Sequence, residues 1–181
     1  MSKIDAIIEG VIDREGGYSN NAADRGGETM YGITKATARR NGYGGEMRAL
    51  PREVAKAIYM REYVTQPGFG AIIPLSEGVA AELVDTGVNM GPSVPARFLQ
   101  MALNGLNNGG KLYKDIVEDA DVGPATVGAL AAYLKKRGKE GETVMLTALN
   151  CMQGARYIEL ARTRTANATF LYGWLRTRVK L

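Results

Sequence analysis

Three side chains near the N-terminus could carry out acid–base chemistry together: Glu15, Asp24 and Thr29. A carboxyl group can protonate a leaving oxygen, and a second carboxylate can activate water or stabilise a positively charged transition state, as in glycoside hydrolysis. In that layout Glu15 donates the proton, Asp24 acts as base or stabiliser, and Thr29 helps to orient the water. A Glu at a helix end is also a common surface residue, and an Asp before a Gly-Gly pair often forms a turn. The residue types alone leave both interpretations open.

The residue counts exclude several other kinds of catalysis. The chain of 181 residues contains no histidine, which excludes Ser–His and Cys–His nucleophiles and zinc sites built on imidazole. Its one cysteine, Cys151, lies in an apolar run, so we expect a buried, inert thiol. The chemistry that remains is that of carboxylates, and we expect no cofactor and no metal site.

The first helix must position Glu15. This segment has isoleucine or valine at positions 4, 7, 8, 11 and 12, which is the spacing of one helix face. Glu15 extends this apolar stripe just before Gly16-Gly17 ends the helix, so we expect its side chain to point inward. The negative end of the helix dipole and an apolar setting would both raise the pKa of Glu15, as a general acid working near neutral pH requires.

Beyond Glu15 the sequence predicts one small β element followed by helices. Turn residues and a short alternating stretch predict a β-hairpin or extended loop near residues 18–34, which with the end of the first helix could form one wall of a substrate cleft. Capping residues and apolar periodicity predict helices near residues 34–41, 51–64, 76–88, 95–105, 111–119, 124–138, 142–163 and 166–178. The fold class is therefore mainly α, and the length favours a single compact domain over residues 1–181.

Several strings of residues agree in type and spacing with one known family. They are residues 15–18, 24–34, 85–91, 99–100, 121–126 and 170–176. Together they resemble glycoside hydrolase family 108, the N-acetylmuramidases found among phage endolysins and related bacterial proteins. The resemblance spans nearly the whole chain.

The resemblance implies a lysozyme-like helical fold and a phage endolysin that takes part in host lysis. Such an enzyme hydrolyses the β-1,4 bond between N-acetylmuramic acid and N-acetylglucosamine in bacterial peptidoglycan. The family's catalytic glutamate falls on Glu15, within a catalytic half over residues 1–89, and residues 90–181 correspond to a helical, peptidoglycan-binding half. The order Glu15, Asp24, Thr29 is also similar to that of phage-type lysozymes, although the gap between Asp24 and Thr29 is one residue shorter here.

Three further side chains could contact sugars: Tyr18, Tyr31 and Asn89. Aromatic rings stack on pyranose faces, and an amide can both donate to and accept from an N-acetyl group. Alternatively, the two tyrosines pack the hairpin and Asn89 caps its helix. The single tryptophan, Trp174, is expected to be a core anchor of the last helix.

The C-terminal segment, residues 156–181, has six basic residues and one acidic residue within a chain of net charge +4. It could contact the anionic envelope, and an amphipathic final helix could disturb an outer membrane; alternatively, these charges form a solvated helix face. The first residues lack the pattern of a signal peptide. We therefore expect a monomer that is made in the host cytoplasm and acts on the cell wall, in the periplasm, after release.

Three other functions compete with hydrolysis of the glycan. A lytic transglycosylase would cut the same bond with one glutamate and no water, which leaves Asp24 and the family resemblance unexplained. A non-catalytic wall-binding or secretion-related protein would keep the fold without needing Glu15. A nucleic-acid-binding protein would account for the positive charge, but that charge is not concentrated on one recognition helix, so we expect no nucleic-acid partner.

Overall fold

The computed structural model describes residues 1–20, 27–163 and 165–179. These residues form α-helices with one two-stranded antiparallel sheet, so the mainly α class and the small hairpin are confirmed. The α-helices and strands are α1 (Lys3–Glu15), β1 (Thr29–Met30), β2 (Ile33–Thr34), α2 (Lys35–Arg40), α3 (Arg52–Met60), α4 (Glu77–Met90), α5 (Ser93–Leu106), α6 (Pro124–Thr163) and α7 (Thr165–Arg178). Three short helices of other types are η1 (Met47–Ala49), η2 (Arg61–Thr65) and η3 (Phe69–Ile72).

Contacts along the chain divide it into two compact units, Met1–Gln66 (unit 1) and Pro67–Leu181 (unit 2). Each unit has its own buried apolar core. The organisation as a single compact domain, with halves that meet near residue 90, stays a prediction.

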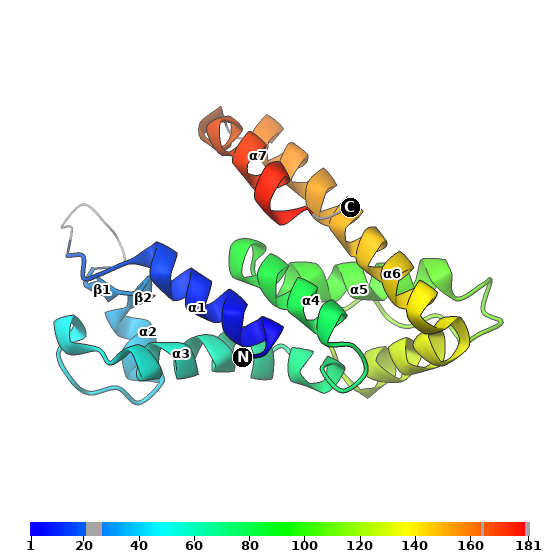
Figure 1. Ribbon diagram of the computed structural model, residues 1–181, viewed down its shortest axis with the longest axis horizontal. Coiled ribbons are helices and arrows are strands. Elements are labelled where there is room, and N and C mark those ends of the chain that lie inside the picture. Colours follow the sequence, from blue (N-terminus) through cyan, green and yellow to red (C-terminus); the bar gives the residue numbers. More distant parts are fainter. Residues whose placement is uncertain (21–26, 164, 180–181) are drawn as a thin grey trace. The chain divides into compact units, whose positions relative to one another are not determined.

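In unit 1, α1 and α3 lie side by side, with the β-hairpin near the C-terminal end of α1 (Figure 1). Ser2 begins α1 with a capping box: its hydroxyl accepts from the Asp5 backbone N–H, and the Asp5 carboxylate accepts from the Ser2 N–H. The buried face of α1 consists of Ile4, Ile8, Val11 and Ile12. The predicted apolar stripe is therefore correct as far as Ile12.

The acidic face of α1 is paired with cations of α3. The Arg52 guanidinium lies 2.6 Å from a Glu9 oxygen and 2.7 Å from an Asp13 oxygen. The Lys56 ammonium lies 3.1 Å from Asp5 and 3.3 Å from Glu9. Hydrogen bonds from Arg52 hold the pKa of Glu9 below its ordinary value, and the Ser2 hydroxyl, followed by Lys56, does the same for Asp5. We call the ion pairs among Asp5, Glu9, Asp13, Arg52 and Lys56 the α1–α3 ion network.

Unit 2 is a helical assembly in which α4, α5 and α6 pack together. The Ser76 hydroxyl caps α4 as the sequence predicted, accepting from the Val79 N–H at 2.9 Å. The long helix α6 breaks at Gly138, whose φ of 60° and ψ of −148° are not helical, and the Tyr133 hydroxyl donates to the Gly141 carbonyl next to this break. The predicted helix end near residue 138 is thus confirmed.

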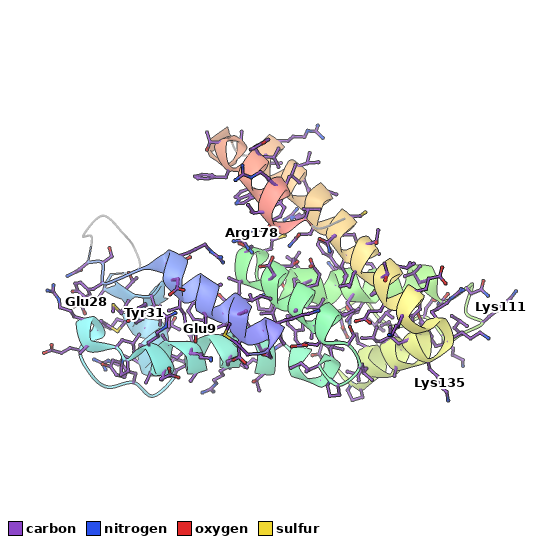
Figure 2. The ribbon with its side chains drawn as sticks, in the orientation of Figure 1. Glu9, Glu28, Tyr31, Lys111, Lys135 and Arg178 are labelled. Carbon is purple, nitrogen blue, oxygen red and sulfur yellow. The ribbon has the colours of Figure 1, made fainter. Side chains whose placement is uncertain are left out.

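α7 folds back along the later part of α6 (Figure 1). The partly buried Trp174 stacks on the buried Tyr157 of α6 with ring centroids 5.0 Å apart, so it anchors the last helix as expected. Arg178 reaches from α7 to Asp85 of α4 at 3.2 Å (Figure 2). The exposed Phe170 and Tyr172 show that α7 does not separate apolar and polar side chains into two faces. The expectation of an amphipathic final helix is therefore not met.

The helix predicted near residues 111–119 is wrong, because this segment is an irregular loop. Side-chain amides of α5 hold its backbone instead. Asn104 accepts from the Ile116 N–H and donates to the Ile116 carbonyl, both at 2.9 Å. Gln100, which is 1% exposed, accepts from the Ala120 N–H at 2.8 Å and donates to the Asp121 carbonyl at 3.0 Å. These bonds replace the intrahelical ones that the apolar pattern had suggested.

The expectation of a buried thiol is also wrong, because Cys151 is exposed. Its neighbours Asn150 and Gln153 are buried on the inner face of α6, and Cys151 falls on the outer face of the same turn. Among the ranges described, no helix is long and apolar enough to cross a bilayer.

The α1–α3 ion network should make unit 1 sensitive to acid. Folded Asp5 and Glu9 bind protons less readily than their ordinary pKa values of 3.8 and 4.5 imply, so their stabilisation is complete above those values and is lost as the pH falls below them. We expect the urea midpoint to drop more between about pH 6 and about pH 3 in the native protein than in Arg52→Gln. Arg14→Gln, which removes the same charge outside the network, should keep the native pH dependence. Equal pH dependence in all three proteins would contradict this explanation.

The amides of α5 should stabilise unit 2 through the loop that they hold. Gln100→Met keeps the side-chain volume but leaves the Ala120 N–H and the Asp121 carbonyl without that partner. We expect a loss of about 1–3 kcal/mol in the free energy of unfolding, measured by urea denaturation. Met101→Gln, at a position that is 43% exposed, should change it by less than about 0.5 kcal/mol.

Candidate active site

Glu15 is the last residue of α1, and its side chain is exposed. The predicted inward orientation is therefore wrong. The buried face of α1 ends at Ile12, and one turn later the residue that lies against Glu15 is Gly32 of the hairpin, which has no side chain to cover it. Glu15 thus presents its carboxylate at the surface beside a glycine.

The hairpin turn that faces Glu15 is formed by Tyr31 and Gly32. Both have positive φ, 54° and 72°, and Met30 pairs with Ile33 on either side of them, which is a two-residue type I′ hairpin. A Cβ on Gly32 would lie 2.9 Å from the Glu15 Cγ, 3.0 Å from its Oε2 and 3.0 Å from the Tyr59 hydroxyl oxygen. Position 32 therefore needs glycine both for its backbone conformation and for the space beside the carboxylate.

The peptide groups of Tyr31 are held from two sides. Its N–H donates to the Gly16 carbonyl at 3.2 Å, directly after Glu15. Its carbonyl accepts from the Tyr59 hydroxyl of α3 at 2.9 Å. We call this pair of bonds the Tyr31 clamp. It connects the end of α1, the hairpin turn and α3 at the position of Glu15.

Tyr59 lies just before a change in helix geometry. α3 ends at Met60 and continues as the π-helix η2, in which the Gln66 N–H bonds the Arg61 carbonyl. Short π-helical segments occur frequently at functional sites. Tyr59 is 7% exposed, and burial raises its pKa well above the ordinary value, with smaller contributions from Glu15, Tyr63 and Glu62. Sequence reasoning missed Tyr59, whose only signal was its place on the buried face of a predicted helix.

The other hairpin residues occupy well-defined places. Thr29 exchanges two backbone hydrogen bonds with Ser19, at 2.8 and 3.0 Å, which pairs the segments on either side of residues 21–26. The Tyr18 hydroxyl donates to Glu28 at 2.9 Å, and the Arg48 guanidinium lies 4.5 Å above its ring. Figure 2 shows Glu28 and Tyr31 at the hairpin. Tyr18 thus packs within the hairpin region, and its contact with sugar stays a prediction.

Neither Asp24 nor Asn89 is among the described residues of unit 1. Asp24 lies outside the described residues. Asn89 belongs to unit 2, where its exposed side-chain amide donates to the Asp85 carbonyl one turn earlier in α4, at 2.7 Å. This bond keeps the Asn89 amide on its own helix. The catalytic roles of Asp24 and Thr29 and the sugar contacts of Tyr31 and Asn89 stay predictions.

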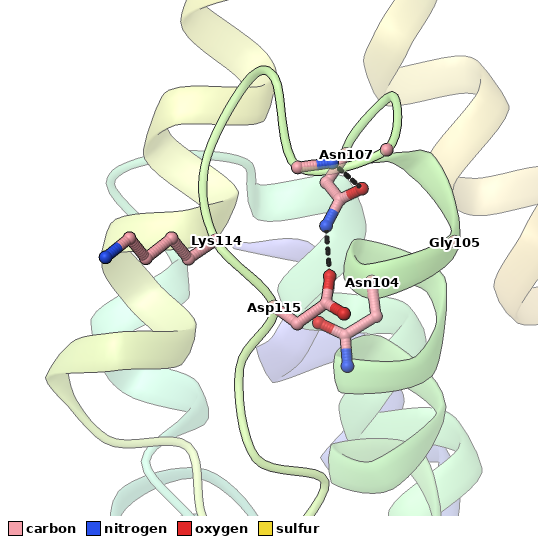
Figure 3. A pocket seen from close by; sticks show the side chains of 7 residues that line it. Asn104, Gly105, Asn107, Lys114 and Asp115 are labelled. Atoms are coloured by element: carbon pink, nitrogen blue, oxygen red, sulfur yellow. Dashed lines mark hydrogen bonds between the residues drawn. The ribbon is translucent and has the colours of Figure 1, made fainter.

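Unit 2 contains a hollow of about 690 Å³ beside the loop that follows α5. It is lined by Asn104, Asn107, Lys114, Asp115 and the glycines at positions 105, 109 and 110. The Asn107 amide donates to Asp115 and accepts from the Gly110 N–H, and Lys114 projects away from this pair (Figure 3). The polar groups of the hollow are thus mainly used to hold the loop. No cluster of acidic or cysteine side chains suited to a metal ion is found in the part of the chain that the structure describes.

Comparisons with known proteins match two parts of the chain to two family models. Residues 8–91 match the family model described as Glycosyl hydrolase 108, and residues 94–179 match the model described as Predicted Peptidoglycan domain. Residues 8–91 are a glycosyl hydrolase 108 domain. The family resemblance is therefore confirmed, and the chain is a glycosidase that acts on peptidoglycan. Glu15, the hairpin turn that faces it and the Tyr31 clamp all lie inside the glycosyl hydrolase 108 domain.

A solved structure shares the fold. The protein described as "Structure of Brucella abortus SagA" is 22% identical to this chain, with a TM-score of 0.60 over 93% of this chain and 85% of that chain. This likeness shows a common fold. A search of curated proteins gave no match to the sequence.

The space at Gly32 should be essential for activity. Gly32→Ala adds a Cβ within 3.0 Å of the Glu15 carboxylate in a turn with φ of 72°. We expect it to destabilise the protein by about 1–2 kcal/mol through its backbone strain and, in addition, to abolish most peptidoglycan hydrolysis. Gly42→Ala is the matched control, because Gly42 also has positive φ but no atom within 4 Å of its added Cβ. It should show a similar loss of stability with near-native activity, and inactivity of both variants would argue against a specific role for the Gly32 space.

Proposed function

We propose that the glycosyl hydrolase 108 domain is an N-acetylmuramidase with Glu15 as its general acid. It would hydrolyse the β-1,4 bond between N-acetylmuramic acid and N-acetylglucosamine in bacterial peptidoglycan. One observation carries the proposal: Glu15 presents an exposed carboxylate at the end of α1, against a glycine turn, within residues 8–91. The absence of histidine from the sequence leaves carboxylates as the natural acid–base groups.

Glu15 would protonate the oxygen that leaves when the glycosidic bond breaks. In the free protein this carboxyl is open to solvent, so a bound glycan strand would itself cover it. Burial of a carboxyl without a cation favours its neutral form, which is the form a general acid needs. The substrate would thereby exclude from the carboxyl the water that α1 leaves in contact with it.

Asp24 would supply the second carboxylate. It would act either as the base that activates a water molecule or as the group that stabilises the oxocarbenium-like transition state, with Thr29 helping to orient the water. Tyr18 and Tyr31 would contribute sugar contacts at the same hairpin, and Asn89 a further one. Two carboxyl groups roughly 6.5–9.5 Å apart produce inversion, and roughly 5–5.5 Å produces retention, so the anomeric configuration of the first product distinguishes the two roles of Asp24.

Unit 2 would hold the enzyme on the wall. This proposal follows from the peptidoglycan match of residues 94–179. Ion pairs already occupy part of the basic C-terminal segment, because Arg156 pairs with Glu159 and Arg178 with Asp85. Envelope contact would fall to the remaining basic side chains. As a phage endolysin, the enzyme would reach the cell wall after release from the host cytoplasm.

The reaction and the role of Glu15 can be tested together on purified peptidoglycan. Mass spectrometry of the digest should find new reducing ends on N-acetylmuramic acid, and Glu15→Gln should reduce the rate by about 100- to 10,000-fold. Glu46→Gln, at an exposed carboxylate of the same unit, should keep the native rate.

Other outcomes would reject particular parts of the proposal. Reducing N-acetylglucosamine would change the bond that is cut, and anhydro ends would identify a lytic transglycosylase. Undiminished activity of Glu15→Gln would remove Glu15 from its role. Absence of any product would favour a non-catalytic wall-binding protein.

A further inference from the structure

The Tyr31 clamp places a buried tyrosine behind the exposed carboxylate of Glu15. The Tyr59 hydroxyl donates to the Tyr31 carbonyl at 2.9 Å, and the next residue, Gly32, lies against both Glu15 and this hydroxyl. On the other side the Tyr31 N–H is fixed to Gly16. Glu15 is thus bordered by a turn whose position depends on one side-chain hydrogen bond from α3.

The hydroxyl of Tyr59 is well suited to a fixed donor role. Its ring is 7% exposed and stacks on Tyr63, with centroids 5.7 Å apart and planes inclined by 24°. Burial raises the pKa of Tyr59, and the carboxylates of Glu15 and Glu62 raise it further, so the phenol is protonated and can donate at neutral pH. The hydrogen bond that this hydroxyl makes is to the Tyr31 carbonyl, so its effect on Glu15 passes through the hairpin turn.

We propose that Tyr59 is a positioning residue for Glu15. By donating to the Tyr31 carbonyl, it holds the Gly32 turn against the Glu15 side chain and restricts the orientations open to the carboxylate. This inference rests on the proposed function of Glu15. It predicts that the hydroxyl contributes to the rate of the chemical step and not to the binding of peptidoglycan, because reacting groups must be aligned closely for proton transfer.

The test compares Tyr59→Phe with Tyr63→Phe. Both remove one phenol hydroxyl and keep the stacked rings, but no hydrogen bond from the Tyr63 hydroxyl is found among the residues that the structure describes. With peptidoglycan as substrate, we expect Tyr59→Phe to lower kcat about tenfold with KM changed by less than about twofold, and Tyr63→Phe to remain close to the native protein. Urea denaturation of both variants checks that they are folded under the assay conditions.

A second measurement does not depend on activity. Amide hydrogen exchange followed by NMR should be about tenfold faster at Tyr31 in Tyr59→Phe and unchanged in Tyr63→Phe, because the turn loses its hydrogen bond to α3. Native kcat in Tyr59→Phe, a loss expressed mainly in KM, or equal losses in both variants would overturn the inference. Inactive Glu15→Gln beside fully active Tyr59→Phe rejects this inference alone, whereas fully active Glu15→Gln rejects the proposed function and the positioning role together.

Discussion

The Tyr31 peptide is the point on which the geometry around Glu15 depends. Its N–H bonds the carbonyl that follows Glu15, and its carbonyl accepts from a hydroxyl of α3. The strands β1 and β2 have only two residues each, so bonds from outside this pair help to hold the turn. Two bonds to two different helices convert this turn into a fixed boundary of the candidate active site.

The α1–α3 ion network and the Tyr31 clamp both connect α3 to the segment formed by α1 and the hairpin. Buried isoleucines bring α1 against the rest of unit 1, and Arg52 and Lys56 align the polar edge of α1 with α3. These pairs are exposed enough for solvent to weaken them, so they adjust the register of two helices more than they hold the unit together. The clamp depends on that register, because Tyr59 lies on α3 and its acceptor follows α1 through the hairpin.

The sequence predicted the elements that carry the candidate site better than the contacts that arrange them. Glu15 at a helix end and a hairpin before Thr34 follow from local rules of periodicity, glycine breaks and capping. The orientation of Glu15 could not be obtained in this way, because it depends on which residue packs beside the last turn of α1. That residue is a glycine 17 positions later, and its partner Tyr59 comes from a further helix. Periodicity marks Tyr59 as buried and says nothing about the acceptor of its hydroxyl.

The same limit explains the helix that was expected after α5 and is absent. Residues 111–119 have a composition that a helix would tolerate, yet Asn104 bonds both backbone groups of Ile116. Gln100 bonds the Ala120 N–H and the Asp121 carbonyl directly after this segment. A side-chain amide can both donate to and accept from the backbone. The N–H and C=O groups that it bonds are therefore not left unpaired in an irregular segment. Tyr59 does for the hairpin turn what these amides do for the loop. In both units, polar side chains of a regular helix fix the backbone of an irregular segment, and such bonds join residues that no local pattern connects.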